Sequence, residues 1–298
     1  AGGHDGVIAL GGGSALDAGK AIALIAAQSC DLFDLEDVGD NWRRADAGHI
    51  HPTIAVPTTA GTGSEVGRAA VITDQAAARK RIIFHPRMTP PAVIADPALT
   101  TGLPPALTAA TGMDALAHNL EAFCAPGFHP MARGIAVEAI AMLKTWLPRA
   151  VADGADLTAR SHMLAASTMG ATAFQRGLGA MHALAHPLGA IYDAHHGLLN
   201  AVLMPYVLTA NRPAIDGDLD YLARCLDLGD GDGVVAWIRD LRAEIGIPDG
   251  LRDIGIDDDA AERVGALAVA DPSAATNPRA LTAADYADLF RRAVNGQH

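Results

Sequence analysis

Short aliphatic runs alternate with a helix-like stretch in the first hundred residues of the chain. Residues 7–10 (VIAL) and 53–56 (TIAV) each end at a loop rich in glycine, threonine or serine. Runs of this kind are typical of buried strands in a parallel sheet. Residues 14–27 between them have helical composition and contain no proline. Further strand-like runs are residues 71–73, 81–84 and 93–95, of which the first two predict a hairpin. This alternation predicts an α/β sheet with ligands at the carboxyl ends of its strands.

The pattern changes near residue 99, where long segments rich in alanine and leucine with helical periodicity begin. The predicted helices are residues 105–124, 130–152, 157–178, 196–210, 233–245, 258–270 and 282–294. Two segments rich in turn-forming residues, 227–233 and 271–279, predict surface loops. We therefore expect an α/β domain over residues 1–98 and an all-helical domain over residues 99–298.

Composition and charge exclude several classes of protein. Of the 298 residues, 50% are hydrophobic and 19% are charged, which is typical of a folded chain with a sizeable core. The 22 basic and 34 acidic residues give a net charge of −12, whereas a nucleic-acid binder normally carries a basic face. No apolar run approaches the roughly 20 residues needed to span a bilayer, and no signal-peptide pattern is recognised. We expect a cytoplasmic protein without nucleic-acid or membrane partners.

Cysteine usage indicates neither a disulfide framework nor a thiolate metal site. Cys30, Cys124 and Cys225 are an odd number of widely spaced residues, and none belongs to a C-x-x-C pair.

The first glycine-rich loop, Gly11-Gly12-Gly13-Ser14, lies between a predicted strand and a predicted helix. Glycine lets the backbone approach a phosphate closely, and the N–H groups at a helix N-terminus attract the anion. The loop is not G-x-G-x-x-G, because Leu16 occupies the position of the last glycine, and it is not a Walker A loop. The alternative is a glycine-rich turn with Ser14 as the N-cap of the following helix.

A second loop, residues 57–65 (PTTAGTGSE), also follows a predicted strand and presents hydroxyl groups and flexible backbone. In a doubly wound sheet, two loops after neighbouring strands converge on one crevice. The alternative is a solvated loop that caps the next helix through Ser64.

A set of histidines in the helical part carries the strongest chemical signal. Asp114 and His118 are four residues apart, as are His182 and His186, and His196 follows ten residues later. Residues at this spacing share one helical face, and a carboxylate with imidazoles suits Fe²⁺ or Zn²⁺. The spacing differs from H-E-x-x-H, because no glutamate lies between the paired histidines. A single histidine on an apolar helix is usually a core residue. A buried Asp114, however, would cost several kcal/mol unless a cation or hydrogen bonds compensated its charge.

The other histidines are not expected to bind a metal. His195 adjoins His196 but should point elsewhere along the chain. The remaining ones lie in loops or polar segments and are expected at the surface: His4, His49, His51, His85, His129, His162 and His298.

Taken together, these motifs resemble those of the iron-containing (group III, metal-dependent) alcohol dehydrogenase family. The resemblance extends over essentially the whole chain. It includes GGGS at residues 11–14 with Asp17 and Lys20, the loop 57–65, GMDALAH at 112–118, HALAHPLGA at 182–190 and HG at 196–197. A weaker part is Asn277-Pro278-Arg279, followed by Leu281-Thr282. The resemblance implies a Rossmann-like α/β domain followed by a helical domain, in a dehydroquinate synthase-like architecture.

The resemblance also implies a role for each motif residue. Asp114, His118, His182 and His196 would bind Fe²⁺, with Zn²⁺ as the alternative, and His186 would be the catalytic histidine near the nicotinamide of NAD or NADP. Gly12, Gly13 and Ser14 would hold the cofactor pyrophosphate, with Asp17 alongside. Thr58 and Thr59 would line the nicotinamide and phosphate side of the crevice, and Lys80 the ribose side. The implied reaction is reversible hydride transfer between a small alcohol and its aldehyde or ketone, in a homo-oligomer.

Two features depart from the family pattern. Gly67-Arg68 stands where a hydroxyl residue is common. Family members normally carry a further stretch before the first glycine-rich loop, so the α/β domain is expected to be N-terminally incomplete. Two alternatives to the dehydrogenase remain at this point: a metal-free enzyme similar to maleylacetate reductase, and a non-catalytic metal-binding fragment of such a dehydrogenase.

Overall fold

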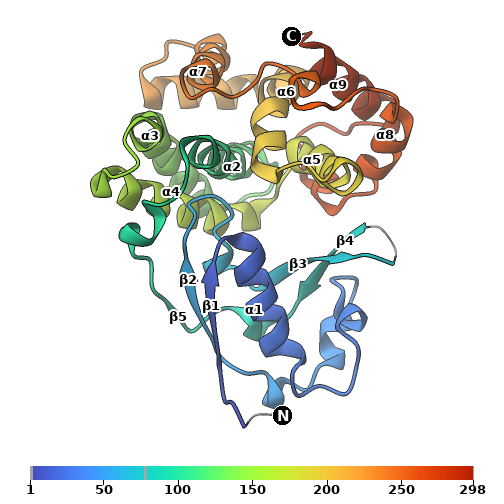
Figure 1. Cartoon of the computed structure of the whole chain (residues 1–298). Coiled ribbons are helices and arrows are strands. Elements are labelled where there is room, and N and C mark those ends of the chain that lie inside the picture. The colour runs from blue at the N-terminus through green and yellow to red at the C-terminus, as the bar shows by residue number, and fades with distance from the viewer. Residues whose placement is uncertain (1–2, 77–78, 298) are drawn as a thin grey trace.

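The computed structural model describes residues 3–76 and 79–297 of the chain. Figure 1 shows two parts, one with the strands and the first helix and the other built from helices. Within the described residues every strand lies before residue 94, and the long helices of the second part begin at Pro105. The predicted fold class, a Rossmann-like α/β part followed by a helical part, is confirmed.

A three-stranded parallel sheet forms the centre of the first part. β1 (Val7–Gly11) pairs with β2 (Thr53–Pro57), which pairs with β5 (Ala92–Val93). The helix α1 (Gly13–Ile25) follows β1 directly and packs against the sheet, with Leu16 between Ala9 and Ala55. Parallel pairing places the ends of β1 and β2 at one edge, so the two loops that follow these strands are neighbours.

The predicted hairpin is also present, although it forms a sheet of its own. β3 (Ala69–Asp74) and β4 (Arg79–Phe84) pair antiparallel, and their apolar face packs on α1. The polar stretch between the two strands includes residues 77–78, which lie outside the described residues.

Eight helices of the second part surround a shared apolar core. They are α2 (Pro105–Cys124), α3 (Pro130–Ala152), α4 (Leu157–Ala173), α5 (Ala180–Tyr192), α6 (His196–Leu226), α7 (Gly231–Glu244), α8 (Ala261–Val269) and α9 (Ala283–Asn295). α2 lies at the centre, in contact with α3, α4 and α6, and each of its residues from Gly112 to Cys124 is buried. Polar side chains on α2 are therefore held in a dry environment.

Two predicted helices had wrong bounds, and one helix was not predicted. α6 continues to Leu226 instead of ending near residue 210, because buried residues keep helical spacing through Ile215, Leu219 and Leu222. α4 ends at Ala173 instead of residue 178, before the turn at Gly177, whose φ of 142° suits glycine. α5 was not among the predicted helices, because Pro187 and Gly189 interrupt its pattern.

The segment 271–279 is not a surface loop throughout, contrary to the prediction. It contains a short 3₁₀ helix (Pro272–Thr276), and Ser273 and Asn277 are buried. Asn277 instead makes hydrogen bonds within the helical part, to Ala180 and Asn211.

Among the described residues, no helix is both long enough and apolar enough to cross a membrane.

Candidate metal and cofactor site

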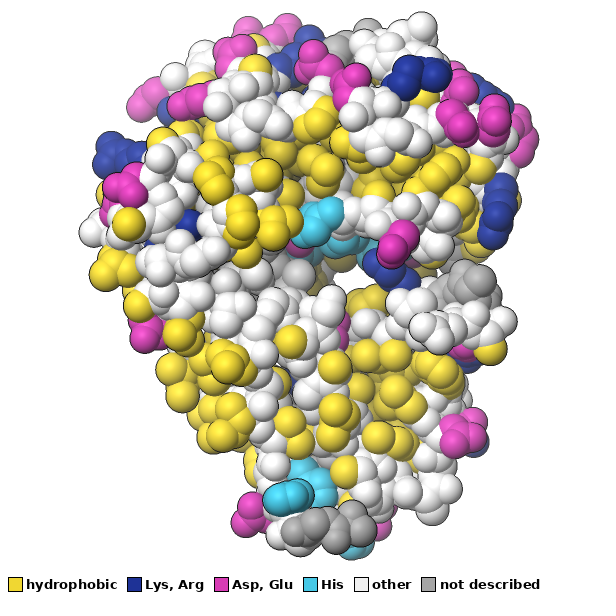
Figure 2. All heavy atoms as spheres, in the orientation of Figure 1, with side chains coloured by type: hydrophobic (Ala, Val, Ile, Leu, Met, Phe, Trp, Pro, Cys, Tyr) yellow, Lys and Arg dark blue, Asp and Glu magenta, His cyan; other side chains and the backbone are white. Residues whose placement is uncertain are grey.

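The structure brings together the four residues of the predicted metal site. α2 carries Asp114 and His118, the middle of α5 carries His182, and α6 begins with His196. One donor atom each from Asp114, His118 and His182 lie within 4.8 Å of one another. The Nε2 atom of His196 lies 3.6 Å from the Asp114 carboxylate. Figure 2 shows histidine side chains at the hollow between the helical part and the strand part.

A glycine allows the helix with His196 to come close to α2. A Cβ atom built on Gly197 would lie 2.4 Å from the carbonyl oxygen of Ala110 and 3.1 Å from the Cβ of Asp114. Real Cβ atoms do not approach backbone so closely, so a larger residue would push α6 away from α2. His196 is thus a candidate ligand, and Gly197 is the residue that lets it reach the cluster.

Burial and neighbouring charges set the protonation of the cluster. Burial lowers the pKa of His182 and of His196 well below its usual range, so both imidazoles are neutral at pH 7. Burial also opposes ionisation of Asp114, but the nearby histidines and a hydrogen bond from Asn200 lower its pKa to about 2. One carboxylate and neutral imidazoles are the protonation states in which these groups bind a divalent metal.

Asn200, one turn after His196, was missed by the sequence analysis. Its Nδ2 atom donates to Asp114 Oδ1 at 2.9 Å and lies 3.2 Å from the Nε2 atoms of both His182 and His196. Both imidazoles therefore direct Nε2 to the same place. The Oδ1 atom of Asn200 and the Nδ1 atom of His196 are buried without a hydrogen-bond partner. The convergence of two imidazole nitrogens and a carboxylate oxygen on one place fits a bound transition metal.

Each of three histidines at the site has a partner for its Nδ1 atom. His118 donates to the carbonyl oxygen of Gly61 at 3.3 Å, and His182 lies 2.7 Å from Glu121 Oε2. His186 lies 2.8 Å from Asp271 Oδ2. Such partners fix the tautomer of a histidine and leave Nε2 to face a metal or substrate. The sequence analysis missed Glu121 and Asp271, because only tertiary packing places them beside α5.

His186 lies next to the cluster without being part of it. Its ring stacks on that of His196, with ring centres 5.4 Å apart, and it remains half-buried. His186 therefore lies beside the candidate ligands, as predicted. Its bond to Asp271 uses Nδ1 and does not involve Nε2.

The two glycine-rich loops lie against each other, as predicted. Thr58 N donates to Gly11 O at 3.0 Å, and a Cβ atom on Gly13 would lie 2.6 Å from the side chain of Thr62. Ser14 does not cap α1, since the N-cap is Gly12 and has no side-chain partner. The N-terminal N–H groups of α1 are thus not covered by a side-chain cap, which is the arrangement that anion-binding helices use.

Asp17 and Lys20 connect α1 to the second glycine-rich loop through hydrogen bonds. Asp17 accepts hydrogen bonds from Ser64 Oγ and Val71 N. The Lys20 ammonium is buried and lies 3.2 Å from Asp17. It donates to the carbonyl oxygens of residues 64, 67 and 69. Burial lowers the pKa of Lys20 although Asp17 opposes the shift. Ser64 is held by this network and so is not a solvated cap.

Lys80 on β4 approaches the metal cluster from the strand part. Its Nζ atom lies 3.4 Å from a Cβ atom built on Gly189 of α5. Burial lowers its pKa, opposed by the charges of Asp114 and Asp193. Lys80 therefore lies beside α5, and its charge acts on Asp114 and His196 of the cluster.

Among the histidines assigned to the surface, His85 was placed wrongly. It is buried and its Nδ1 accepts a hydrogen bond from Arg87 N at 3.0 Å. His195 does point away from the cluster, as predicted, and its Nδ1 accepts from Leu198 N at the start of α6. His298 lies outside the described residues.

Comparison with known proteins gives matches over nearly the whole chain. Residues 1–97 match the family model described as iron-containing alcohol dehydrogenase, and residues 108–294 that of the C-terminal part of the Fe-containing alcohol dehydrogenase family. The chain is 42% identical to 4-hydroxybutyrate dehydrogenase of Cupriavidus necator, over 98% of this chain and 78% of that protein.

Two solved structures share the fold over a similar extent. A crystal structure of 1,3-propanediol oxidoreductase has a TM-score of 0.92 and 36% identity, covering 97% of this chain and 77% of that one. Sulfoacetaldehyde reductase of Bifidobacterium kashiwanohense in complex with NAD⁺ has a TM-score of 0.88 and 32% identity, covering 97% and 76%.

Proposed function

Because the chain belongs to the iron-containing alcohol dehydrogenase family, we propose that it transfers a hydride between a small alcohol and NAD with iron at the histidine cluster. It is a metal-dependent alcohol dehydrogenase, an oxidoreductase that acts on CH–OH groups. The observation that carries the proposal is the convergence of Asp114, His118, His182 and His196 directly beneath the loop that contains Gly61.

Each of the two proposed domains supplies one part of the site. Residues 1–98 form the dinucleotide-binding domain, and residues 99–298 form the helical metal-binding domain. Gly12, Gly13 and Ser14 would hold the pyrophosphate at the N-terminus of α1, where backbone N–H groups attract phosphate. Asp17 supports this site through Ser64 and Lys20. Thr58 and Thr59 line the nicotinamide side of the crevice, and Lys80 the ribose side.

The chemistry divides between the bound groups and the side chains of this chain. When bound, the metal supplies a Lewis acid that lowers the pKa of the substrate hydroxyl, and NAD supplies the hydride acceptor. Asp114, His118, His182 and His196 would hold the metal, and the Asp114 carboxylate would balance part of its charge. His186, with Nδ1 held by Asp271, offers Nε2 to the proton released by the substrate hydroxyl and passes it toward solvent.

The relatives suggest the kind of alcohol. 4-Hydroxybutyrate, 1,3-propanediol and sulfoacetaldehyde, named for the three similar proteins, are short molecules with a polar group at the end remote from the reacting carbon. We propose that this chain acts on a short primary alcohol of that type, as a homo-oligomer.

Metal content tests the proposal first. Protein purified without oxygen should hold about one iron per chain, and Asp114→Ala should lose it, because neutral imidazoles alone compensate a divalent charge poorly. Zinc in place of iron would change the metal assignment. A folded protein without metal that still oxidises NADH with maleylacetate would instead support the metal-free reductase.

Cofactor and substrate binding test the second half of the proposal. NADH fluorescence should change on titration with the metal-loaded protein. Initial rates should then be higher with 4-hydroxybutyrate or 1,3-propanediol than with 1-butanol or 1-propanol, which lack the remote polar group. A protein that binds metal but no NADH would be a metal-binding fragment without catalytic function.

A further inference from the structure

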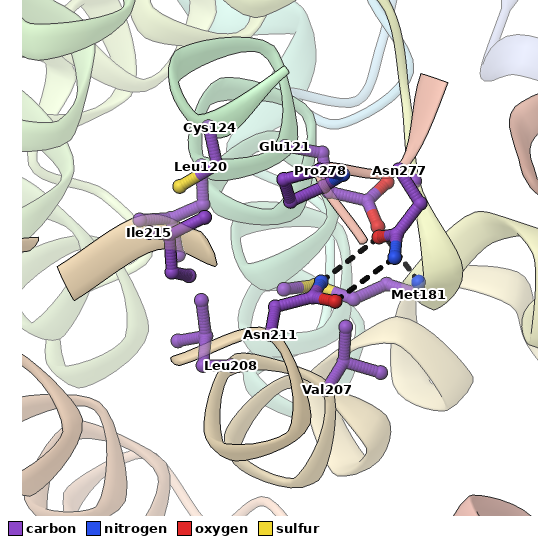
Figure 3. Close-up of a pocket in the computed structure, with 11 residues that line it drawn as sticks. Leu120, Glu121, Cys124, Met181, Val207, Leu208, Asn211, Ile215, Asn277 and Pro278 are labelled. Carbon is purple, nitrogen blue, oxygen red and sulfur yellow. Dashed lines mark hydrogen bonds between the residues drawn. The ribbon is translucent and has the colours of Figure 1, made fainter. Parts of the chain in front are cut away.

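The N-terminus of α5, two residues before His182, has no cap of its own. The N-cap residue is Gly179, which has no side chain to accept a hydrogen bond. Two buried side chains from elsewhere in the chain replace it. Ala180 N donates to Asn277 Oδ1 at 3.0 Å. Met181 N donates to Glu121 Oε1 at 2.7 Å, and Figure 3 shows Glu121, Met181 and Asn277 close together. The helix that carries His182 and His186 is thus fixed at its start by residues from α2 and from the segment after α8.

Glu121 also determines which nitrogen of His182 carries the proton. Its Oε1 atom is used by Met181 N, and its Oε2 atom lies 2.7 Å from His182 Nδ1. Asn200 Nδ2, a donor, lies 3.2 Å from His182 Nε2, so the lone pair of the neutral imidazole is on Nε2 and Nδ1 donates to Glu121. Nε2 is the atom that lies with the other donors of the cluster. Burial raises the pKa of Glu121 to about 7, while the N–H groups at the start of α5 lower it.

Asn277 is held in one orientation by its own partners. Its Oδ1 atom accepts from Ala180 N, and its Nδ2 atom donates to the carbonyl oxygen of Arg279 at 2.7 Å. A second pair of hydrogen bonds connects it to Asn211 of α6, at 2.8 and 2.9 Å. The Asn277-Pro278-Arg279 motif, to which no part of the proposed reaction assigns a role, therefore fixes the same end of α5 as Glu121.

The space around this anchor is too small for a ligand. The cavity between Glu121, Asn277 and Asn211 has a volume of about 10 Å³, room for one water molecule. A Cβ atom on Gly179 would lie 2.9 Å from both Glu121 Oε1 and Asn277 Oδ1, so the backbone of α5 is in direct contact with the two side chains. These polar groups serve the helix and its histidine, and no bound molecule is needed to explain them.

We propose that Glu121 and Asn277 are positioning residues for the metal ligand His182: Asn277 fixes the start of α5, and Glu121 fixes both that start and the Nδ1–H tautomer. This inference rests on the proposed metal site. Neither residue touches the substrate or the metal, so the effect passes through His182.

The binding of Co²⁺ tests this role without measuring activity. We expect Glu121→Gln to raise the Kd of Co²⁺, measured against a competing chelator, by about 10- to 100-fold. A glutamine can offer only one oxygen, so either Met181 N or His182 Nδ1 loses its acceptor. The visible absorption of bound Co²⁺ should also change, because the ligand field depends on His182. Asn277→Ala should raise the Kd less, since it leaves the tautomer in place.

Glu65→Gln is the matched control. Glu65 is also buried, but its Oε1 atom accepts from the hydroxyl of Thr168, and within residues 3–76 and 79–297 it has no hydrogen bond to a histidine. We expect it to leave the Kd and the Co²⁺ spectrum unchanged even if it lowers the melting temperature. His182→Gln gives the reference for complete loss of the ligand.

The outcomes separate this inference from the proposed function. Wild-type protein that binds no Co²⁺ would refute the metal site itself. Wild-type binding with an unchanged Kd and spectrum in Glu121→Gln would overturn only the role of Glu121, even if the variant were less stable. If Glu121→Gln does not fold, ¹⁵N spectra of the metal-free wild type decide. The His182 signal, assigned by its loss in His182→Gln, should show a protonated Nδ1, and a protonated Nε2 would overturn the inference.

Discussion

At the scale of single residues, the site pairs three of its histidines, His118, His182 and His186, with partners that control their tautomers. Asp271 divides its carboxylate between His186 Nδ1 and the N–H of Ser273, each at 2.8 Å. The 3₁₀ helix that begins there therefore holds the catalytic candidate in place. Unlike Glu121, Asp271 acts on a histidine outside the cluster, so its loss should affect turnover and spare the metal.

We expect His186→Ala to lower kcat by about 100-fold and to leave the iron content per chain unchanged. A positioned acid–base group contributes about 10²- to 10⁴-fold to a rate. The measurement is steady-state kinetics beside metal analysis of the same preparation. Equal loss of iron and turnover would make His186 a ligand or a structural residue.

Asp271→Asn should lower kcat through the same histidine. Asparagine still caps the 3₁₀ helix, but its amide cannot accept from His186 with the strength of a carboxylate. If Asp271 acts only through His186, a variant with both Asp271→Asn and His186→Ala should have the same kcat as His186→Ala alone. Two changes that act through one residue are not additive. Independent, multiplying losses in the double variant would show that Asp271 has another role.

Sequence spacing indicated the candidate cluster but not the residues that orient its side chains. Asp114 and His118, and likewise His182 and His186, lie one helical turn apart, so the pattern within each helix pointed to these residues. Glu121 is three residues after His118, yet its partner lies on α5, and only the packing of the two helices shows the pair. Asn200 is one turn after His196, a spacing that a search limited to histidines and acids overlooks.

At the scale of elements, one buried lysine holds the second glycine-rich loop against α1. Lys20 donates to the carbonyl oxygens of Ser64, Gly67 and Ala69. No single loop residue could replace these bonds, because three backbone acceptors meet at one ammonium group. The loop that faces the metal cluster thus takes its position from the helix that follows the first loop.

We expect Lys20→Met to lower the free energy of unfolding by about 3 kcal/mol, because it leaves Asp17 without its buried cation. NADH binding should weaken as well, since the second loop loses its attachment. Urea denaturation and fluorescence titration measure the two effects. Lys144→Met, on α3 of the helical part, is the control and should change neither quantity. Normal NADH affinity in a destabilised Lys20→Met would separate the loop from cofactor binding.

Helix contact sets the geometry of the cluster, and two glycines of α6 test this. Gly197→Ala should cost about 1–3 kcal/mol of stability through overpacking against Ala110 and should weaken metal binding. Gly217→Ala in the same helix has open space and should stabilise the protein by up to about 1 kcal/mol. Thermal unfolding and Co²⁺ titration measure both variants. Normal metal affinity in Gly197→Ala would show that α6 can shift without moving His196.

The elements that the sequence predicted well are those with one uninterrupted pattern. The strands before residue 94 and helices such as α2 and α9 follow their aliphatic or helical periods closely. α5 and the second half of α6 contain prolines at residues 187 and 213, and their helical state depends on packing in the core. Segment 271–279 has the composition of a loop, and its burial follows from tertiary hydrogen bonds that no local pattern contains.

At the scale of the whole molecule, polar contacts connect the strand part to the helical part close to the site. Gly61 O accepts from His118 Nδ1 at 3.3 Å, and Glu65 Oε1 accepts from Thr168 Oγ1 at 2.8 Å. Both acceptors belong to the second glycine-rich loop, and both donors are on helices of the other part. The loop proposed to line the nicotinamide is therefore bonded directly to a proposed metal ligand.

Such a connection predicts that metal and dinucleotide bind cooperatively. Metal at the cluster should fix the ring of His118 and with it the carbonyl of Gly61, so the second loop is already ordered when NADH arrives. We expect the Kd of NADH to fall by about fivefold or more when the metal is present, a typical coupling between sites. By linkage, NADH must raise the affinity for the metal by the same factor. Calorimetric titration of each ligand with and without the other measures both factors, and Thr168→Val serves as control because it removes a contact between the parts that does not involve His118. Equal NADH affinities in metal-free and metal-loaded protein would show that the Gly61–His118 contact transmits nothing between the two sites.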